Sequence, residues 1–219
     1  KDQGKALRTE LGQNRPVWIA ASTHKGEDEQ VLAAFAQIKQ QHADAVMILV
    51  PRHPERFDSV ATLCQQHFAH TVRRSQNPTT AELIQADIYL ADSMGEMPIM
   101  LAASDVCFMG GSLLGDKVGG HNLLEPAALA KPCITGPSYY NFADVTAQLL
   151  QLNAVTVVQN EDELAKTVTA LFDDQQAAIA MGNNAKAVVT ANTGALDKII
   201  NKLSVFLDVI VEKDKNNSH

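Results

Sequence analysis

Four short segments combine arginine, histidine, glycine and acidic residues in patterns that could bind a charged ligand. They are Ser22–His24, Pro51–Arg56, Asp92–Glu96 and Gly110–Glu125, and each follows a short apolar run. Because the carboxyl ends of parallel strands meet at one edge of a sheet, we expect the four segments to lie together there.

Arg52 and Arg56 lie in the segment PRHPER, after a buried apolar run and around an expected helix start. Both guanidinium groups could extend over the strand ends toward a phosphate or carboxylate, because the guanidinium fork binds oxyanions through two parallel hydrogen bonds. An alternative fits the spacing equally well, in which Arg56 pairs with a surface acid and Arg52 caps a turn. His53, between them, is expected to be structural.

The glycine-rich segment GGSLLGDKVGGHNLLEP begins at Gly110 and leads into an expected helix. Glycine permits close approach of the backbone to a ligand, and a helix start attracts anions. The segment matches neither GxxxxGK[ST] nor GxGxxG, and such loops also occur as plain turns. We predict a phosphate cradle around Gly110, Gly111 and Ser112, with Lys117 as a solvated loop charge.

Asn122 and Glu125 could form a capping pair at that helix start. Pro126 argues against the pair, because it would have to supply the amide that closes the first helical bond, and proline has none. A helix that starts two or three residues later tolerates Pro126 and leaves the Glu125 carboxylate free. We predict that this carboxylate accepts hydrogen bonds from both hydroxyl groups of a ribose.

The segment ADSMGEMP carries a similar pattern, since Ser93 and Glu96 have capping-box spacing and Pro98 weakens that assignment. Gly95 would let a nucleobase lie against the backbone, although an ordinary strand-to-helix turn fits equally well. His67 and His70 lack a third ligand and are expected to be solvated. The sequence contains no HExxH or GxSxG and shows no nucleophile–base arrangement, so we expect no metal, no cofactor and no catalytic base in this chain.

Short apolar runs alternate with helical patterns, which is typical of β-α-β units and a mostly parallel sheet. The predicted fold class is α/β, a Rossmann-like parallel sheet with helices on both faces. Strands are expected at Val17–Ala21, Ala45–Val50, Thr71–Arg73, Ile88–Leu90, Val106–Met109, Cys133–Thr135 and Val155–Val158. Helices are expected at Glu27–Gln41, Pro54–Phe68, Met97–Ala103, Glu125–Ala130, Phe142–Leu152, Glu161–Phe172, Gln175–Thr190 and Gly194–Val211, with an exposed loop at Arg73–Ala81.

The composition is that of a soluble globular domain. With 219 residues, 46% of them hydrophobic, the chain can bury a core. The formal net charge of −7 argues against nucleic-acid binding, which depends on Lys and Arg. The three cysteines are expected to be buried, reduced thiols of a cytoplasmic protein, and no run approaches the roughly 18 apolar residues that span a bilayer.

Five segments together resemble the C-terminal domain of bacterial 3-deoxy-D-manno-octulosonic acid (Kdo) transferases. They are VPRHPERF, DSMGE, FMGGSL, GGHNLLEPAAL and GPSYYNFADV, and they occur in the family's order. The resemblance implies half of a GT-B glycosyltransferase, in which two Rossmann-like domains face each other across a cleft. It implies the end of an interdomain connection at residues 1–14 and a donor nucleotide-binding domain at 15–212. The polar residues 213–219 are expected to form a flexible tail.

The resemblance also implies which residues hold the donor, CMP-Kdo. Glu125 would take the ribose hydroxyl groups, and Arg52 or Arg56 would lie near donor charge. The turn Gly110-Gly111-Ser112 and the helix start near Leu124 would face the phosphate. The residues expected to hold the CMP moiety are Pro51, Arg52, Met94, Gly95, Glu96, Asn122, Leu123, Leu124 and Glu125.

The family transfers Kdo to a lipid A precursor with inversion and without a metal, and its general base and membrane anchor lie in an N-terminal domain. The resemblance therefore places the full-length protein at the cytoplasmic face of the bacterial inner membrane. This fragment would be soluble, inactive without that domain, and would stabilise the departing CMP electrostatically.

Two departures from the family pattern concern the longer loop Ser112–Gly119 and the run Ser138-Tyr139-Tyr140 in place of one like His-Thr-Phe. Two other functions stay open: a GT-B transferase or epimerase for another sugar nucleotide, and a nucleotide-binding module without catalysis. A dehydrogenase is not expected, because AASTH stands where the dinucleotide glycine fingerprint should follow the first strand.

Overall fold

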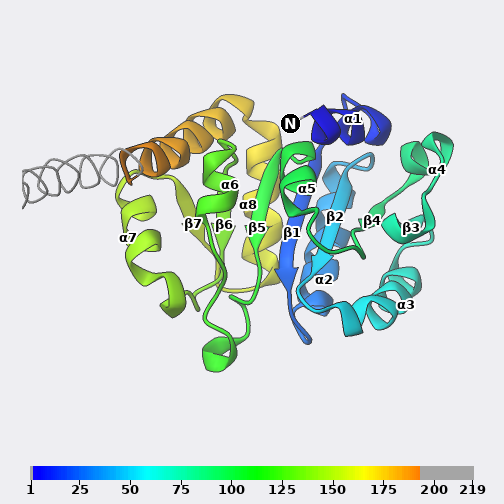
Figure 1. The fold of residues 1–219 in the computed structure, drawn as a ribbon, viewed down its shortest axis with the longest axis horizontal. Helices are drawn as coiled ribbons and strands as arrows, with labels where there is room; N and C mark the ends of the chain where they lie inside the picture. The colour runs from blue at the N-terminus through cyan, green and yellow to red at the C-terminus, as the bar shows by residue number, and fades with distance from the viewer. Residues whose placement is uncertain (1, 193–219) are drawn as a thin grey trace, which may run out of the picture.

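The computed structural model describes residues 2–192, and its centre is a seven-stranded parallel sheet with the strand order β3-β4-β2-β1-β5-β6-β7 (Figure 1). The predicted α/β class and all seven predicted strands are confirmed. The strands are β1 (Val17–Thr23), β2 (Val46–Pro51), β3 (Thr71–Arg73), β4 (Ile88–Leu90), β5 (Val106–Met109), β6 (Cys133–Thr135) and β7 (Val155–Val157).

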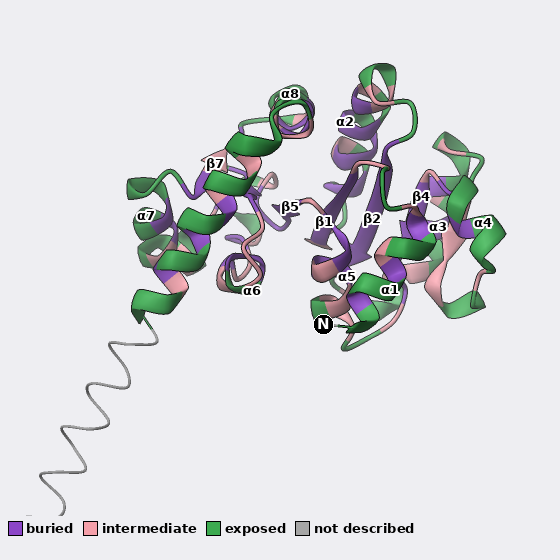
Figure 2. Cartoon of the chain, turned by 90° about the horizontal axis from the view of Figure 1, so that it is seen from above, coloured by how far each residue is buried: buried purple, intermediate pink, exposed green. Residues whose placement is uncertain are grey.

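Helices cover both faces of the sheet, so the strands lie buried between two helical layers (Figure 2). Val17 and Ile19 of β1 contact one core, whereas Trp18 and Ala20 contact the other, as the alternation of side chains along a strand requires. The helices are α1 (Asp2–Leu11), α2 (Asp28–Gln41), α3 (Phe57–His67), α4 (Thr80–Gln85), α5 (Met97–Ala103), α6 (Leu124–Ala128), α7 (Ala143–Gln151), α8 (Glu161–Asp173) and a last helix over 175–192.

Two helices were not expected from the sequence. Helix α1 buries Leu7 and Leu11, and its Gly4 lies so close to α5 that a β-carbon there would be 2.4 Å from Ala102 Cβ. Helix α4 starts at a capping box in which Thr79 and Glu82 satisfy each other's amides, so the loop expected at Arg73–Ala81 is wrong in its last part. The helix expected at Gly194–Val211 and the tail at 213–219 lie outside the described residues.

The connections reverse direction between β1 and β5, because β1 leads to β2 on one side and β5 leads to β6 on the other. In open α/β sheets, the crevice beyond the carboxyl ends of two such strands is where ligands bind. The segment Ser22–His24 lies at the end of β1, and Gly110 directly follows β5, so two of the four candidate segments meet at this crevice.

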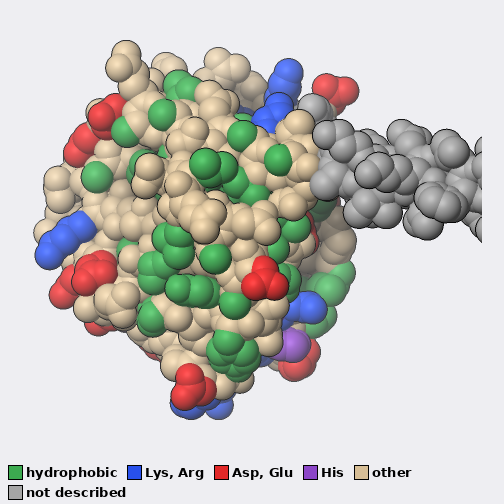
Figure 3. Space-filling view, turned by 90° about the vertical axis from the view of Figure 1, so that its left-hand side faces the viewer, with side chains coloured by type: hydrophobic (Ala, Val, Ile, Leu, Met, Phe, Trp, Pro, Cys, Tyr) green, Lys and Arg blue, Asp and Glu red, His purple; other side chains and the backbone are tan. Residues whose placement is uncertain are grey.

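The three cysteines, Cys64, Cys107 and Cys133, are free and buried, as predicted. Within residues 2–192, no helix has the length and apolar character needed to cross a membrane. On the face that lies at the left of Figure 1, hydrophobic side chains are scattered over the surface, with charged side chains mainly toward its edges (Figure 3). Helix α7 lies on that side, and Leu150 and Leu152, at its end, are exposed.

Candidate functional site

A pocket of about 330 Å³ opens at the carboxyl edge of the sheet, and side chains from all four candidate segments line it. The structure thus confirms that these segments meet. We call this the carboxyl-edge pocket. Its lining residues are Ser22, Val50, Pro51, Arg52, Ser93, Met94, Gly95, Met97, Met109, His121, Asn122, Glu125 and Phe142.

Arg52 is an available cation at this pocket. Its backbone amide donates to the carbonyl of Thr23 at 3.0 Å, which fixes the turn after β2. Its side chain is exposed and makes no hydrogen bond or ion pair within residues 2–192. An unpaired guanidinium beside a pocket can bind a phosphate or a carboxylate with two parallel hydrogen bonds.

Arg56 is used inside the protein instead. Its guanidinium donates to the Thr23 carbonyl at 2.8 Å and forms an ion pair with the Asp28 carboxylate, which is only 2% exposed. Burial raises the pKa of Asp28, and the hydrogen bond from Thr23 and the charge of Arg56 oppose this rise. Arg56 therefore pairs with an acid, as the alternative assignment held, but the acid is buried, and Arg56 does not line the pocket.

The glycine turn after β5 holds an anion of the protein itself. The fully buried Glu27 carboxylate accepts hydrogen bonds from the amides of Gly111 at 2.6 Å, of Ser112 and Leu113 at 3.0 Å, and of His24 at 3.3 Å. Burial raises the pKa of Glu27, whereas these amides lower it. The amides of Gly111 and Ser112, expected to face a phosphate, are thus engaged by Glu27 in this structure.

Two glycines make this arrangement possible. A β-carbon at Gly110 would lie 2.7 Å from a Glu27 carboxylate oxygen and 3.0 Å from two carbonyl oxygens of the β1 end. Gly111 has φ of 69°, and a β-carbon there would lie 2.8 Å from Val118 Cγ1 and 3.0 Å from the ring of His121. The glycines after β5 therefore allow the backbone to lie close to the side chains of Glu27 and His121.

Helix α6 starts at Leu124, so Asn122 is not its N-cap residue and Pro126 lies in its first turn, as the Pro126 argument required, although the start is one residue before the expected Glu125. The Asn122 side chain accepts a hydrogen bond from the Leu124 amide, the first of the helix, at 3.0 Å, without any contribution from Glu125. Within the described residues Glu125 makes no hydrogen bond or ion pair, and it is exposed at the pocket. Leu123 is buried, and neither it nor Leu124 lines the pocket.

The segment after β4 exposes its main chain to the pocket, whereas the carboxylate of its acid, Glu96, is engaged within the protein. Hydrogen bonds from Arg74, at 2.9 and 3.1 Å, and from Ser93 occupy the Glu96 carboxylate and lower its pKa. Met94 is 61% exposed, and Gly95 has φ of 81° with no atom within 4 Å of where a β-carbon would stand. Met94 and Gly95 thus form an open platform, whereas Glu96 holds the segment in place.

Sequence reasoning did not assign Ser22, His121 or Phe142 to the site. Ser22 has φ of 58°, a conformation that is uncommon in residues with a β-carbon and is often found at functional sites. Its segment had been singled out, but only the fold shows that the strained residue itself faces the pocket. Phe142 comes from the start of α7, and no local pattern indicates that it reaches this edge of the sheet.

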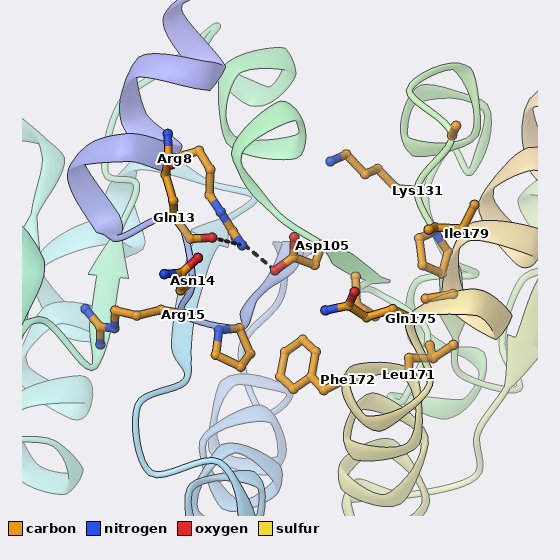
Figure 4. Close-up of a pocket in the computed structure, with 15 residues that line it drawn as sticks. Arg8, Gln13, Asn14, Arg15, Asp105, Lys131, Leu171, Phe172, Gln175 and Ile179 are labelled. Carbon is orange, nitrogen blue, oxygen red and sulfur yellow. Dashed lines mark hydrogen bonds and ion pairs between the residues drawn. The ribbon is translucent and has the colours of Figure 1, made fainter.

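A larger hollow, of about 470 Å³, lies at the amino edge of the sheet near Arg8, Asp105 and Lys131 (Figure 4). Its cations are used internally: Arg8 pairs with Asp105 at 2.8 Å and donates to the Ala103 carbonyl, and Lys131 donates to the Ser104 carbonyl at the end of α5. These groups stabilise a helix end, so the larger hollow is not the candidate site.

The family model for "Glycosyl transferases group 1" matches residues 17–188. The chain belongs to this family, and its architecture is the one expected for a GT-B domain. It is homologous to the C-terminal part of bacterial Kdo transferases. The solved C-terminal CMP-Kdo binding domain of WaaA from Acinetobacter baumannii is 38% identical, with a TM-score of 0.79, over 86% of this chain and 96% of that one.

Two transferases show the same relationship in sequence. The 3-deoxy-D-manno-octulosonic acid transferase of Haemophilus influenzae is 40% identical over 204 residues, which are 93% of this chain and 47% of that protein. The transferase of the same name from Rickettsia prowazekii is 34% identical over 195 residues, 89% of this chain and 40% of that protein. The chain therefore spans less than half the length of these relatives.

Proposed function

We propose that this chain is the donor-binding domain of a Kdo transferase and that the carboxyl-edge pocket binds CMP-Kdo. One observation supports this most. The pocket combines an unpaired guanidinium at Arg52, an uncommitted carboxylate at Glu125 and open main chain at Gly95. These groups suit a phosphate, a ribose and a base, in a chain 38% identical to a CMP-Kdo binding domain.

In this proposal Glu125 accepts hydrogen bonds from the ribose hydroxyl groups, the base lies on Met94 and Gly95, and Arg52 meets the phosphate. Pro51 and Asn122 complete the walls. The remaining predicted residues contribute indirectly, because they hold the loops that carry these contacts. They are Glu96, Leu123, Leu124, Arg56, Gly110, Gly111 and Ser112.

The full-length protein would transfer Kdo to a lipid A precursor. An acceptor hydroxyl oxygen attacks the anomeric carbon of Kdo, the bond from that carbon to the phosphate oxygen breaks, and its electron pair leaves with CMP. The acceptor proton passes to a general base in the half outside this chain, which would also hold the acceptor site and the membrane contact. The contribution of this domain is the positive charge of Arg52, which stabilises the departing phosphate.

Calorimetric titration of CMP, with UMP and UDP as comparison ligands, tests the proposal. We expect CMP-selective binding that falls about tenfold or more in Glu125→Ala, because a carboxylate hydrogen bond contributes roughly 1.5–3 kcal/mol. Glu29→Ala is the matched control, since Glu29 is also exposed in the first turn of a helix but lies outside the pocket. A clear preference for a uridine nucleotide would overturn the assignment and favour a transferase or epimerase for another sugar nucleotide.

A further inference from the structure

Two imidazole rings meet at the reversal point between β1 and β5. The Nε2 atoms of His24 and His121 lie 2.8 Å apart, and the rings are within 10° of parallel. His121 lines the carboxyl-edge pocket, and His24 supports it from the segment after β1. His53 contacts His24 edge-on, with the ring centroids 5.2 Å apart. The three histidines come from three different loops.

The surroundings of this imidazole pair are cationic. Arg52 and Arg56 extend from the loop after β2, and within the described residues neither His24 nor His121 is paired with a carboxylate. Of the nearby acids in the described part of the chain, Glu27 is engaged by four backbone amides and Asp28 by Arg56, whereas Glu125, which lines the same pocket, makes no ion pair with either ring. Burial, the neighbouring histidines and the arginines lower the pKa of His24, and they lower that of His121 to about 4. The pair is therefore neutral near pH 7 and lies close to the positive charge of Arg52.

The proposed donor carries two anionic groups close together. The sugar named in the transferase relatives is an octulosonic acid, so its carboxylate is attached to the same anomeric carbon that bears the phosphate in CMP-Kdo. Two oxyanions on one carbon need two adjacent groups of donors. Arg52 can serve one of them, but Arg56 is held by Asp28 and cannot serve the other.

We infer that the His24–His121 pair binds the carboxylate of the donor sugar, beside the phosphate held by Arg52. This inference rests on the proposed function and adds the group that distinguishes an acidic sugar donor from CMP alone. The carboxylate supplies the negative charge that the pair lacks, so one imidazole takes up a proton and donates a charge-assisted hydrogen bond to it. Binding of CMP-Kdo near pH 7 should then consume a proton that CMP does not.

The experiment compares CMP and CMP-Kdo by calorimetry with wild type, His24→Gln and His121→Gln. Each titration is run at pH 7 in PIPES and in Tris, whose different ionisation enthalpies report the protons taken up. Wild type should bind CMP-Kdo more tightly than CMP, and binding of CMP-Kdo should be accompanied by the uptake of as much as about one additional proton. Each variant should keep CMP affinity within about twofold, lose about 10- to 100-fold for CMP-Kdo and lose the additional proton uptake. His70→Gln, at an exposed histidine outside the pocket, is the control.

The other outcomes separate the two proposals. If wild type binds CMP selectively but gains no affinity from Kdo, or if the variants keep both the gain and the proton uptake, the role of the pair is refuted and the proposed function stands. If the variants lose CMP and CMP-Kdo affinity in equal proportion, the pair only positions the loop, and the inference is again refuted. A wild-type chain that binds neither ligand would refute both proposals for this domain.

Discussion

The Glu27 carboxylate offers a sharp test of how the glycine turn is held. In Glu27→Gln one carboxylate oxygen is replaced by an NH2 group, which is a donor and faces backbone N–H donors. The side chain can then no longer accept hydrogen bonds from all four backbone amides. One oxygen accepts from the buried Gly111 amide and the half-buried His24 amide, and the other accepts from the buried Ser112 amide and the half-buried Leu113 amide. Loss of either oxygen therefore leaves one buried and one less buried amide without an acceptor.

The magnitude follows from these contacts. A buried amide left without an acceptor costs about 1–3 kcal/mol, and leaving the less buried amide that shares its oxygen, such as that of His24, without an acceptor costs less than that. We expect Glu27→Gln to lower the free energy of unfolding by about 2–4 kcal/mol. In a chain of this length, this corresponds to a melting temperature lower by roughly 5–15 °C.

Thermal and urea unfolding measure this change, with Glu29→Gln as the control in the same helix turn at an exposed position. The control should stay within about 0.5 kcal/mol of wild type. If Glu27→Gln is no less stable than Glu29→Gln, then the four hydrogen bonds do not hold the turn, and our account of the glycines after β5 is wrong.

Three further changes have expected outcomes. Arg56→Met should destabilise the fold by about 2–4 kcal/mol, because it leaves the Asp28 carboxylate buried and unpaired, and adding Asp28→Asn should recover part of the loss in denaturant unfolding. His121 has a lowered pKa, so the unfolded chain binds more protons than the folded chain between about pH 6.5 and about pH 4, and stability should decrease as the pH is lowered through that window. The melting temperature measured from pH 7 down to pH 5 should therefore decrease less steeply for His121→Gln than for wild type. Gly182→Ala, which in an open helix would stabilise, should instead cost about 1–3 kcal/mol in thermal unfolding, because its β-carbon would lie 2.0 Å from the Ala130 carbonyl oxygen.

The central strands were predictable because burial on both faces makes them short apolar runs, as in Val46–Pro51. The start of α6 was predictable for a different reason, since proline lacks an amide and Pro126 excludes an earlier start. The start of helix α4 is also indicated by the sequence, because Thr79 and Glu82 have the spacing of a capping box.

The internal partners of the site could not be predicted, because they join segments far apart in the chain. Glu27 looked like an acid that favours the positive end of α2, yet its carboxylate reaches the turn 84 residues later at Gly111. The partner of Arg56 has the same origin, since Asp28 lies 28 residues earlier. Sequence spacing identifies residues capable of binding an anion, and the fold decides which of them already hold one.

The turn at Gly111–Leu113 directs three consecutive amides at one point, an arrangement that in other proteins receives a phosphate. Here the anion is the side chain of Glu27, so these amides already have a covalently attached acceptor. In the proposed complex the donor phosphate is therefore met by the exposed Arg52 side chain instead of by fixed main-chain donors. Attraction between exposed charges fades over about 8 Å at physiological ionic strength. In the proposed complex, donor capture should therefore weaken as the salt concentration rises.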